Sequence, residues 1–378
     1  MAMKVLVTGA KGFIGRNLVV VLHRRGGINV QEYDLDSAPE SLEEGLASVE
    51  VVFHLAGVNR PQKTQELVHG NVDFTKHICE VLRRLGRKPT LIFTSSTQAA
   101  LDNPYGLSKR QAEDIILNFG EETGTKVAVF RLPGVFGKWC RPNYNSVVAT
   151  FCHNVAHDLP ISITDPAREL ELVHIDDVVA AFLVISDAQG REGMDGFYHV
   201  EPAFRITLNR LAQMIQGFHD TRKSLIVPDF SDHFTRCLYS TYISYLPTAH
   251  FSYSLERRED MRGSLAEVFK STHFGQIFFS RTGPGVVRGN HYHDTKVEKF
   301  AVLEGEAIIR FRHIQAEDVI EYPVSGREFR VVDIPPGYTH SIENIGQSEL
   351  IVLFWAYEPF DPAAPDTYAL NVRKDKCP

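Results

Sequence analysis

The sequence has few cysteines, no excess of positive charge and no long hydrophobic run. Its five cysteines are scattered over 378 residues without a Cys-x-x-Cys pair, which argues against a disulfide scaffold and against a thiolate metal site. No apolar run reaches the roughly 18 residues that a membrane span needs. The 40 Lys and Arg residues form no long basic block and are outnumbered by 47 Asp and Glu residues, for a net charge of −7. This composition argues against a nucleic-acid or membrane partner.

The length and composition predict a globular protein with more than one domain. A chain of 378 residues exceeds the usual single-domain length of about 100–200 residues. Its 43% hydrophobic and 23% charged residues are ordinary for folded domains. The first residues, Met-Ala-Met-Lys-Val, lead into an apolar strand and lack the regions of a signal peptide. We therefore expect a cytoplasmic protein.

Short apolar runs alternate with helix-length stretches in the first half of the chain. This alternation is typical of βαβ units, in which parallel strands are covered by helices on both faces. It predicts an α/β Rossmann-type, doubly wound parallel sheet. The segments that carry the pattern are 4–7, 14–24, 30–33, 49–55, 91–94 and 127–130.

A glycine-rich turn separates the first of these strands from the first helix. Small residues here let the backbone approach a pyrophosphate, and the free amides and dipole at the helix start favour its negative charge. Glycines alone would equally fit an ordinary tight turn, but the strand before them and the helix after them favour a dinucleotide site. The predicted cofactor contacts in this turn are Gly9, Lys11, Gly12, Phe13, Ile14 and Gly15.

A tyrosine and a lysine spaced by one helical turn follow a strand that ends in serines. Tyr105 and Lys109 share one helix face, so the ammonium can lower the pKa of the phenol, which can then exchange a proton with a carbonyl oxygen. Ser96 would hydrogen-bond the same oxygen. By itself the pair would fit a solvated helix face, but the glycine turn and the serine strand favour catalysis. The short spacing leaves open which of Ser95, Ser96 and Thr97 reaches the substrate.

These motifs resemble the short-chain dehydrogenase/reductase superfamily of the extended type. Residues 54–57 match its cofactor-facing loop, 130–137 match the strand and loop before its sugar-nucleotide pocket, and 174–178 match its later His-Val-Asp-Asp-Val element. The resemblance implies a reductase with the catalytic residues Tyr105, Lys109 and Ser96. It also implies that the cofactor site includes Leu55, Ala56, Gly57, Asn71, Tyr105, Lys109 and Leu132.

The end of the second strand bears on the choice of cofactor. The carboxylate of Asp34 can accept hydrogen bonds from an adenosine ribose but would repel a 2′-phosphate, which slightly favours NADH. No Arg lies at that point to bind the phosphate, although Arg60 or Lys63 from another loop could supply the positive charge.

The residue pattern changes after about residue 246, where segments of helix length are replaced by short predicted strands separated by Gly and Pro. We place a domain boundary there, between a reductase domain over 1–246 and a second domain over 253–378. Short strands of this kind are typical of an all-β jelly-roll barrel. The predicted strands are 275–280, 298–303, 307–312, 328–334 and 350–355.

Three histidines and a glutamate in this second domain form a candidate metal site. His291 and His293 are two positions apart on a strand and project to the same face. Glu298 and His340 would complete a set of three His and one Glu, which suits zinc or another divalent metal. A single histidine is more often structural, but four ligand types at this spacing favour a metal. The pattern resembles the paired motifs of the cupin superfamily, whose metal could also serve only to brace the barrel.

The two domains together resemble the CapF family of bacterial capsular polysaccharide enzymes and its O-antigen counterparts. The family resemblance implies that the cupin epimerises C3 of UDP-2-acetamido-2,6-dideoxy-4-keto-hexose and that the reductase then reduces C4. The product would be UDP-N-acetyl-6-deoxy-L-talosamine for capsule or O-antigen synthesis. The resemblance favours NADPH, and we expect a homodimer. The likeness is carried by 136–140, 142–146, 239–242, 289–291, 309–313, 360–362 and 365–368.

The chemistry of this substrate predicts the order of the two steps. A C4 ketone acidifies the C3 hydrogen, so epimerisation has to precede reduction. The candidate proton carriers at C3 are Glu298, Lys296, Tyr338 and His273. The candidate donors to the UDP pyrophosphate are Arg131, Lys138 and Arg141.

Two alternatives stay open. One is a nucleotide-sugar reductase or 4-epimerase whose cupin is purely structural or dimerising. The other is a nucleotide-sugar-sensing binding protein, against which Ser96, Tyr105 and Lys109 argue, because a sensor has no use for a proton relay.

Overall fold

The computed structural model divides the chain into two compact units. It describes residues 2–187, 196–256, 258–260, 263–265, 275–358 and 362–373. None of the helices among these residues combines the length and the hydropathy that crossing a bilayer requires. The first unit comprises Met1–Phe136, Cys140–Val147 and Glu169–Ile206, and the second comprises Gly137–Trp139, Val148–Arg168 and Thr207–Pro378.

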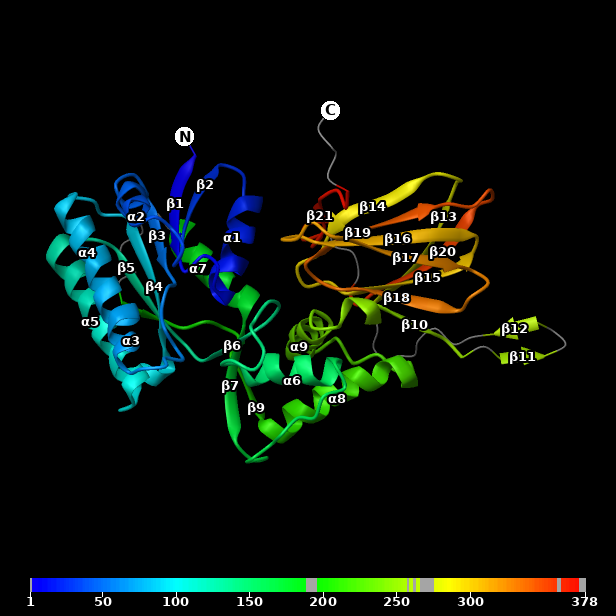
Figure 1. Ribbon diagram of the computed structural model, residues 1–378, viewed down its shortest axis with the longest axis horizontal. Coiled ribbons are helices and arrows are strands. Elements are labelled where there is room, and N and C mark those ends of the chain that lie inside the picture. The colour runs from blue at the N-terminus through cyan, green and yellow to red at the C-terminus, as the bar shows by residue number, and fades with distance from the viewer. Residues whose placement is uncertain are drawn as a thin grey trace. The chain divides into compact units, whose positions relative to one another are not determined.

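A six-stranded parallel sheet forms the centre of the first unit (Figure 1). Its strand order is β2-β1-β3-β4-β5-β8. Thr8 pairs with His54 and His54 pairs with Phe93, so the C-terminal ends of β1, β3 and β4 lie at one edge. The predicted α/β Rossmann-type fold is confirmed. The strands are β1 (Met3–Thr8), β2 (Ile28–Tyr33), β3 (Val51–His54), β4 (Thr90–Ser96), β5 (Val127–Leu132) and β8 (Gly196–Tyr198).

Helices cover both faces of this sheet (Figure 1). Alternate strand side chains point into two apolar cores, with Val5 and Val7 in one and Leu6 in the other. Because both faces are buried, the strands are apolar almost throughout. One face is covered by α1 (Phe13–Arg24) and α7 (Ile175–Asp187), and the other by α2 (Pro39–Leu46), α4 (Phe74–Arg84) and α5 (Pro104–Thr123). The remaining elements are α3 (Gln65–Leu67), a π-helical turn (Val68–Asp73), a 3₁₀ turn (Thr97–Ala100), and a small sheet of β6 (Gly134–Phe136), β7 (Glu169–His174) and β9 (Phe204–Thr207).

The second unit is built on two five-stranded antiparallel sheets, with the orders β10-β18-β15-β20-β13 and β17-β16-β19-β14-β21. Phe300 of the first sheet contacts His340 of the second, with ring centroids 5.7 Å apart, so their side chains meet inside the barrel. The predicted all-β jelly-roll is confirmed. The strands are β10 (Ser252–Ser254), β13 (Gln276–Thr282), β14 (Val287–Tyr292), β15 (Glu298–Glu304), β16 (Glu306–His313), β17 (Val319–Ser325), β18 (Arg330–Ile334), β19 (Tyr338–Asn344), β20 (Leu350–Ala356) and β21 (Tyr368–Ala369). The remaining described elements are a separate pair of strands, β11 (Arg258–Asp260) and β12 (Gly263–Leu265), the helices α6 (Val147–Ala156), α8 (Leu208–Ser224) and α9 (His233–Ile243), and a 3₁₀ turn (Thr248–His250).

The division into units differs from the expected domains 1–246 and 253–378. Strands do replace helices at the expected point, but α8 and α9 belong to the unit of the barrel. Arg222 of α8 forms an ion pair with the buried Asp333 of β18, whose other oxygen lies 2.5 Å from Nζ of Lys299. Phe230 packs on Trp355, with ring centroids 5.6 Å apart. The sequence pattern changes from helices to strands at β10, but α8 and α9, which precede β10, also pack in the unit of the barrel.

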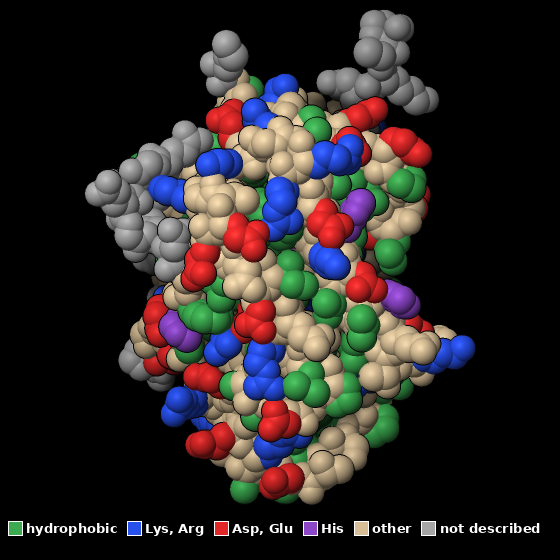
Figure 2. Space-filling view, turned by 90° about the vertical axis from the view of Figure 1, so that its left-hand side faces the viewer, with side chains coloured by type: hydrophobic (Ala, Val, Ile, Leu, Met, Phe, Trp, Pro, Cys, Tyr) green, Lys and Arg blue, Asp and Glu red, His purple; other side chains and the backbone are tan. Residues whose placement is uncertain are grey.

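Charged side chains of both signs are interspersed on the molecular face in Figure 2, without a block of Lys and Arg. Exposed pairs such as Arg83 with Glu122 and Arg84 with Glu43 lie 2.6 Å apart and neutralise each other. This face therefore offers no broad anion-binding surface.

Candidate functional site

The glycine turn between β1 and α1 leaves no room for side chains. A Cβ on Gly9, whose φ is +69°, would lie 2.7 Å from the amide nitrogen of Ala56. A Cβ on Gly15 would lie 2.1 Å from the carbonyl oxygen of Gly9. Gly12 precedes α1 and donates its amide to the carbonyl of Gly9 at 3.0 Å. The turn is therefore compact, and the first amides of α1 follow it directly.

Asp34, at the end of β2, braces this turn. Its two carboxylate oxygens accept the amides of Lys11 at 2.7 Å and of Leu35 at 2.8 Å. The ammonium of Lys11 forms an exposed ion pair with Asp36. Lys11 thus brings a positive charge to the end of β2, where the sequence alone indicates only carboxylates.

A buried chain of hydrogen bonds joins β1 to the segment that holds Asn71. Thr8 Oγ1 lies 2.8 Å from Nδ1 of His54, and Nε2 of His54 lies 2.8 Å from Thr75 Oγ1. Because the Thr75 hydroxyl donates its proton to the carbonyl of Asn71 at 2.6 Å, it has to accept from Nε2 of His54. Burial and the nearby Lys109 lower the pKa of His54 to about 3, which keeps the ring neutral. The sequence did not single out His54 or Thr75 as site residues.

The Asn71 side chain extends this series of hydrogen bonds to α5. Its Oδ1 accepts the amide of Val58 at 2.8 Å, and its Nδ2 donates to Ser108 Oγ at 2.9 Å. The Ser108 hydroxyl in turn donates to the carbonyl of Tyr105 at 2.8 Å. A Cβ on Gly57 would lie 2.8 Å from Oδ1 of Asn71 and 3.1 Å from Nζ of Lys109. These residues, which the sequence placed in one site, do lie together in the structure.

Tyr105 and Lys109 project from the first turns of α5, which Asn103 caps by accepting the amide of Gly106 at 2.9 Å. Burial lowers the pKa of Lys109 to about 8, and its ammonium donates to the carbonyl of Thr94 at 3.0 Å. Burial raises the pKa of Tyr105, and a hydrogen bond with Ser96 opposes that shift. The predicted trio of Ser96, Tyr105 and Lys109 thus gathers at the C-terminal end of β4. Leu132 ends the neighbouring strand, β5, and pairs with Ser96.

Arg131 is not free to bind a pyrophosphate in the expected way. Its guanidinium donates to both oxygens of the buried Glu113, at 2.9 and 2.6 Å, and lies over the ring of Phe197 at 4.2 Å. The other two candidates, Lys138 and Arg141, fall in different units. The sequence could not reveal that a glutamate on α5 takes up the Arg131 side chain.

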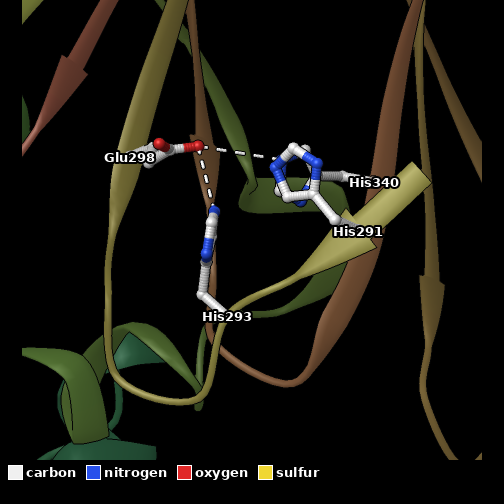
Figure 3. Close-up of side chains that lie close together, drawn as sticks. All are labelled: His291, His293, Glu298 and His340. Carbon is white, nitrogen blue, oxygen red and sulfur yellow. Dashed lines mark hydrogen bonds and ion pairs between the residues drawn. The ribbon is translucent and has the colours of Figure 1, made fainter. Parts of the chain in front are cut away.

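His291, His293, Glu298 and His340 come together inside the barrel of the second unit (Figure 3). Each offers one potential ligand atom, and these atoms all lie within 4.8 Å of one another. Oε2 of Glu298 lies 3.2 Å from Nε2 of His293 and 3.7 Å from Nε2 of His340. The ligands come from β14, from the loop after it, from the start of β15 and from β19.

The environment of these four residues fits a divalent metal. Both ring nitrogens of His340 are buried without a hydrogen-bond partner. Burial, with the neighbouring histidines, holds the pKa of His340 well below its usual range and also lowers that of His291. Burial alone would raise the pKa of Glu298, but hydrogen bonding and charge from His293 reverse the shift, so Glu298 is a carboxylate. Imidazole lone pairs and one carboxylate are ligands that zinc accepts.

The candidate proton carriers at C3 differ in their surroundings. Lys296 donates to the carbonyl of Pro365 at 3.3 Å and to Thr367 Oγ1 at 3.1 Å. Tyr338 packs edge-on against His313, with ring centroids 5.1 Å apart. Burial raises the pKa of Tyr338. His273 lies outside the described residues.

Two family models match the chain. The NAD dependent epimerase/dehydratase family matches residues 5–195. The polysaccharide biosynthesis C-terminal domain matches residues 258–368. The first match covers most of the parallel sheet, its glycine turn and the Ser96, Tyr105 and Lys109 trio, and the second covers the four candidate metal ligands.

Two relatives align with nearly the whole chain, and a third aligns with part of it. A UDP-2-acetamido-2,6-beta-L-arabino-hexul-4-ose reductase of Pseudomonas aeruginosa is 46% identical over 370 residues, which is 98% of this chain and 99% of the relative. The crystal structure of the capsular polysaccharide assembling protein CapF from Staphylococcus aureus is 42% identical and has a TM-score of 0.68, covering 98% of this chain and 100% of that chain. A dTDP-4-dehydro-6-deoxyglucose reductase of Escherichia coli is 24% identical over 268 residues, 59% of this chain and 83% of the relative.

Proposed function

Since the chain belongs to the CapF family of capsular polysaccharide enzymes, we propose that it converts a UDP-linked 4-keto sugar in two steps. The barrel epimerises C3 of UDP-2-acetamido-2,6-dideoxy-4-keto-hexose, and the first unit then reduces C4 to yield UDP-N-acetyl-6-deoxy-L-talosamine. The observation that carries the proposal is the trio of Ser96, Tyr105 and Lys109 in a chain related over its full length to a UDP-hexul-4-ose reductase.

The reduction uses Tyr105 as the proton donor. A nicotinamide cofactor supplies the hydride to C4 when it is bound. The Tyr105 phenol delivers a proton to O4, the Ser96 hydroxyl holds the same oxygen, and solvent restores the phenol proton. The ammonium of Lys109, one turn along α5, favours the phenolate that is left.

The cofactor is held by the turn at the start of α1 and by residues at the ends of β2, β3 and β5. Gly9, Gly12 and Gly15 keep the turn compact, and the pyrophosphate is assigned to the amides of the first turn of α1, because the first amides of a helix have no partner within it. Asp34 faces the ribose, and the charge of Lys11 lies beside it. This pairing of a carboxylate with an ammonium is compatible with NADH and with NADPH. The remaining proposed contacts are Phe13, Ile14, Leu55, Ala56, Gly57, Asn71, Tyr105, Lys109 and Leu132.

The epimerisation relies on the acidity of the hydrogen next to the C4 ketone. A divalent metal would be held by His291, His293, Glu298 and His340. Such a metal would polarise a substrate oxygen when bound. Zinc is the metal with which the site is tested most directly. The protein has to remove the C3 proton from one face and return one to the other. Because Lys296 is turned to 365–367 and Tyr338 packs on His313, neither is assigned as the base.

Deuterium uptake at C3 from heavy water, without nicotinamide, tests the proposal. The wild-type chain should exchange the C3 hydrogen of the 4-keto sugar, and adding NADH or NADPH should then yield the reduced sugar. The Tyr105→Phe variant should lose reduction and still exchange C3. Reduction without C3 exchange in the wild type would instead support a reductase with a purely structural barrel. Full reduction by Tyr105→Phe would refute the role given to the phenol.

A further inference from the structure

Residues 365–372 lie along the strand that carries the first candidate metal ligand. β21 pairs with β14 so that Ala369 is opposite His291. The amide of Leu370 donates to the carbonyl of Asn290 at 2.8 Å. This segment is therefore bound through its backbone to the residues immediately around His291.

The same segment also contacts β19 and β16. The hydroxyl of Thr339, the neighbour of His340, donates to the carbonyl of Leu370. The buried guanidinium of Arg312 donates to the carbonyls of residues 371 and 372, at 2.8 Å each. The segment 365–372 thus contacts the strand of His291 directly and the strand of His340 through Thr339.

Asp366 shapes the loop between the other two ligands, His293 and Glu298. One oxygen of its carboxylate accepts the amide of Asp294 at 2.9 Å. The other accepts the amide of Thr295 at 3.0 Å, the hydroxyl of the same residue at 2.9 Å and the amide of Lys296 at 2.7 Å. Three successive amides that converge on one carboxylate form a tight anion-binding turn. The loop therefore depends on a charge that lies about 70 positions away in the sequence.

The backbone of Asp366 orients His293 itself. Its carbonyl oxygen lies 2.6 Å from Nδ1 of His293, and because a carbonyl can only accept, Nδ1 carries a proton. With Nδ1 engaged by this carbonyl, Nε2 is the ring nitrogen that faces Oε2 of Glu298, at 3.2 Å, and the one left to bind a metal. Asp366 adopts φ +36°, in the left-handed region, to make both sets of contacts.

We propose that Asp366 is a positioning residue of the metal site, and that docking of 365–372 and metal binding strengthen each other. The inference rests on the proposed metal-binding function. Its carboxylate sets the loop between His293 and Glu298, and its carbonyl selects the ligating tautomer of His293. Because both events stabilise one arrangement, the metal should protect the segment as much as the segment favours the metal.

Zinc titration of the full-length chain tests this. Asp366→Asn keeps the shape of the side chain but removes its charge and one of its two acceptor oxygens, so that either Asp294 or the donors of Thr295 and Lys296 lose their acceptor. Asp318→Asn, on an exposed aspartate before β17, is the matched control. Competition with a chromophoric chelator should give a zinc affinity about 10- to 100-fold weaker in Asp366→Asn and unchanged in Asp318→Asn. The visible spectrum of bound Co²⁺ should change in the same variant only.

Amide hydrogen exchange of 365–372 supplies a second readout. Zinc should slow exchange there in the wild type and in Asp318→Asn, and should not do so in Asp366→Asn. Equal zinc affinities in Asp366→Asn and its control would overturn the role of Asp366 alone, whereas a wild type that binds no zinc would refute the metal site and this inference with it. If Asp366→Asn does not fold, Thr295→Val removes one donor and should weaken zinc binding a few-fold, and an unchanged affinity there would count against the inference.

Discussion

The hydroxyl of Ser95 donates a hydrogen bond to the carboxylate of Glu113, and both side chains are buried. Glu113 is also held by Arg131 at 2.6 Å. Ser95 is thereby committed to the interior of the first unit, and the adjacent Ser96, which points to the other face of β4, remains beside Tyr105. Of the three residues that the sequence left open, Ser95 is thus held in the interior, Ser96 lies beside Tyr105, and Thr97 begins the 3₁₀ turn that follows β4.

We expect Ser96→Ala to reduce the turnover of the 4-keto sugar by about 10²- to 10³-fold, because the variant removes a donor from the reacting oxygen. Ser95→Ala should leave turnover within a few-fold and instead lower the free energy of unfolding by about 1 kcal/mol or more, because it deprives buried Glu113 of a partner. Cofactor oxidation at saturating substrate and urea unfolding separate the two effects. A turnover loss in Ser95→Ala as large as that in Ser96→Ala would contradict the assignment.

The buried Lys109 should lower the free energy of unfolding of the cofactor-free protein at neutral pH. Its pKa in the folded state, about 8, lies below the ordinary value of 10.5, so the buried ammonium is unfavourable below pH 8 and this cost disappears as the pH rises towards 10.5. We expect Lys109→Met to lose reductase activity and to unfold at a higher urea concentration than the wild type at pH 7. Its free energy of unfolding should be about 1–3 kcal/mol larger. The stability difference should shrink at pH 9.5. A variant less stable than the wild type at pH 7 would argue against a buried charge.

Gly15→Ala should abolish cofactor binding, because its Cβ would lie 2.1 Å from the carbonyl oxygen of Gly9 and would displace the turn. Gly217→Ala in α8 is the control, since a Cβ there meets no atom within 4 Å. The control should keep cofactor affinity and gain up to about 1 kcal/mol of stability from better helix propensity. Fluorescence titration with NADPH and thermal unfolding measure both. Undiminished NADPH binding by Gly15→Ala would place the cofactor elsewhere.

Asp34→Asn should shift the cofactor preference towards NADPH. The change removes a negative charge beside the position of a 2′-phosphate and leaves the ammonium of Lys11 in place. We expect the ratio of kcat/KM for NADPH to that for NADH to rise roughly tenfold, equivalent to about 1.4 kcal/mol of relieved repulsion. An unchanged ratio in steady-state kinetics would show that another residue selects the cofactor.

Much of the architecture was predictable because local patterns record local geometry. Alternating strand and helix periods indicated the parallel sheet, and the positions of Gly9, Gly12 and Gly15 indicated a tight turn, since each constraint acts within a few residues. The four candidate metal ligands were recognisable for a related reason, because only a few residue types bind metals and His291 and His293 lie two positions apart. The expectation that both lie on one strand was wrong, since β14 ends at Tyr292 and His293 lies in the loop after it. The residues that hold these candidate ligands from far along the chain, such as Asp366, could not be recognised in the sequence.

The sequence by itself determined the two fold classes, the tight glycine turn between the first strand and the first helix, and the types of residue at each candidate site. Only the tertiary structure decided that Glu113 takes up Ser95 and Arg131, that α8 and α9 pack with the barrel, and that Asp366 holds the loop of His293. The physical reason is that periodicity and spacing report the geometry within one element. Which charge or hydroxyl meets a buried group depends on how distant elements pack, and many pairings would satisfy the same composition.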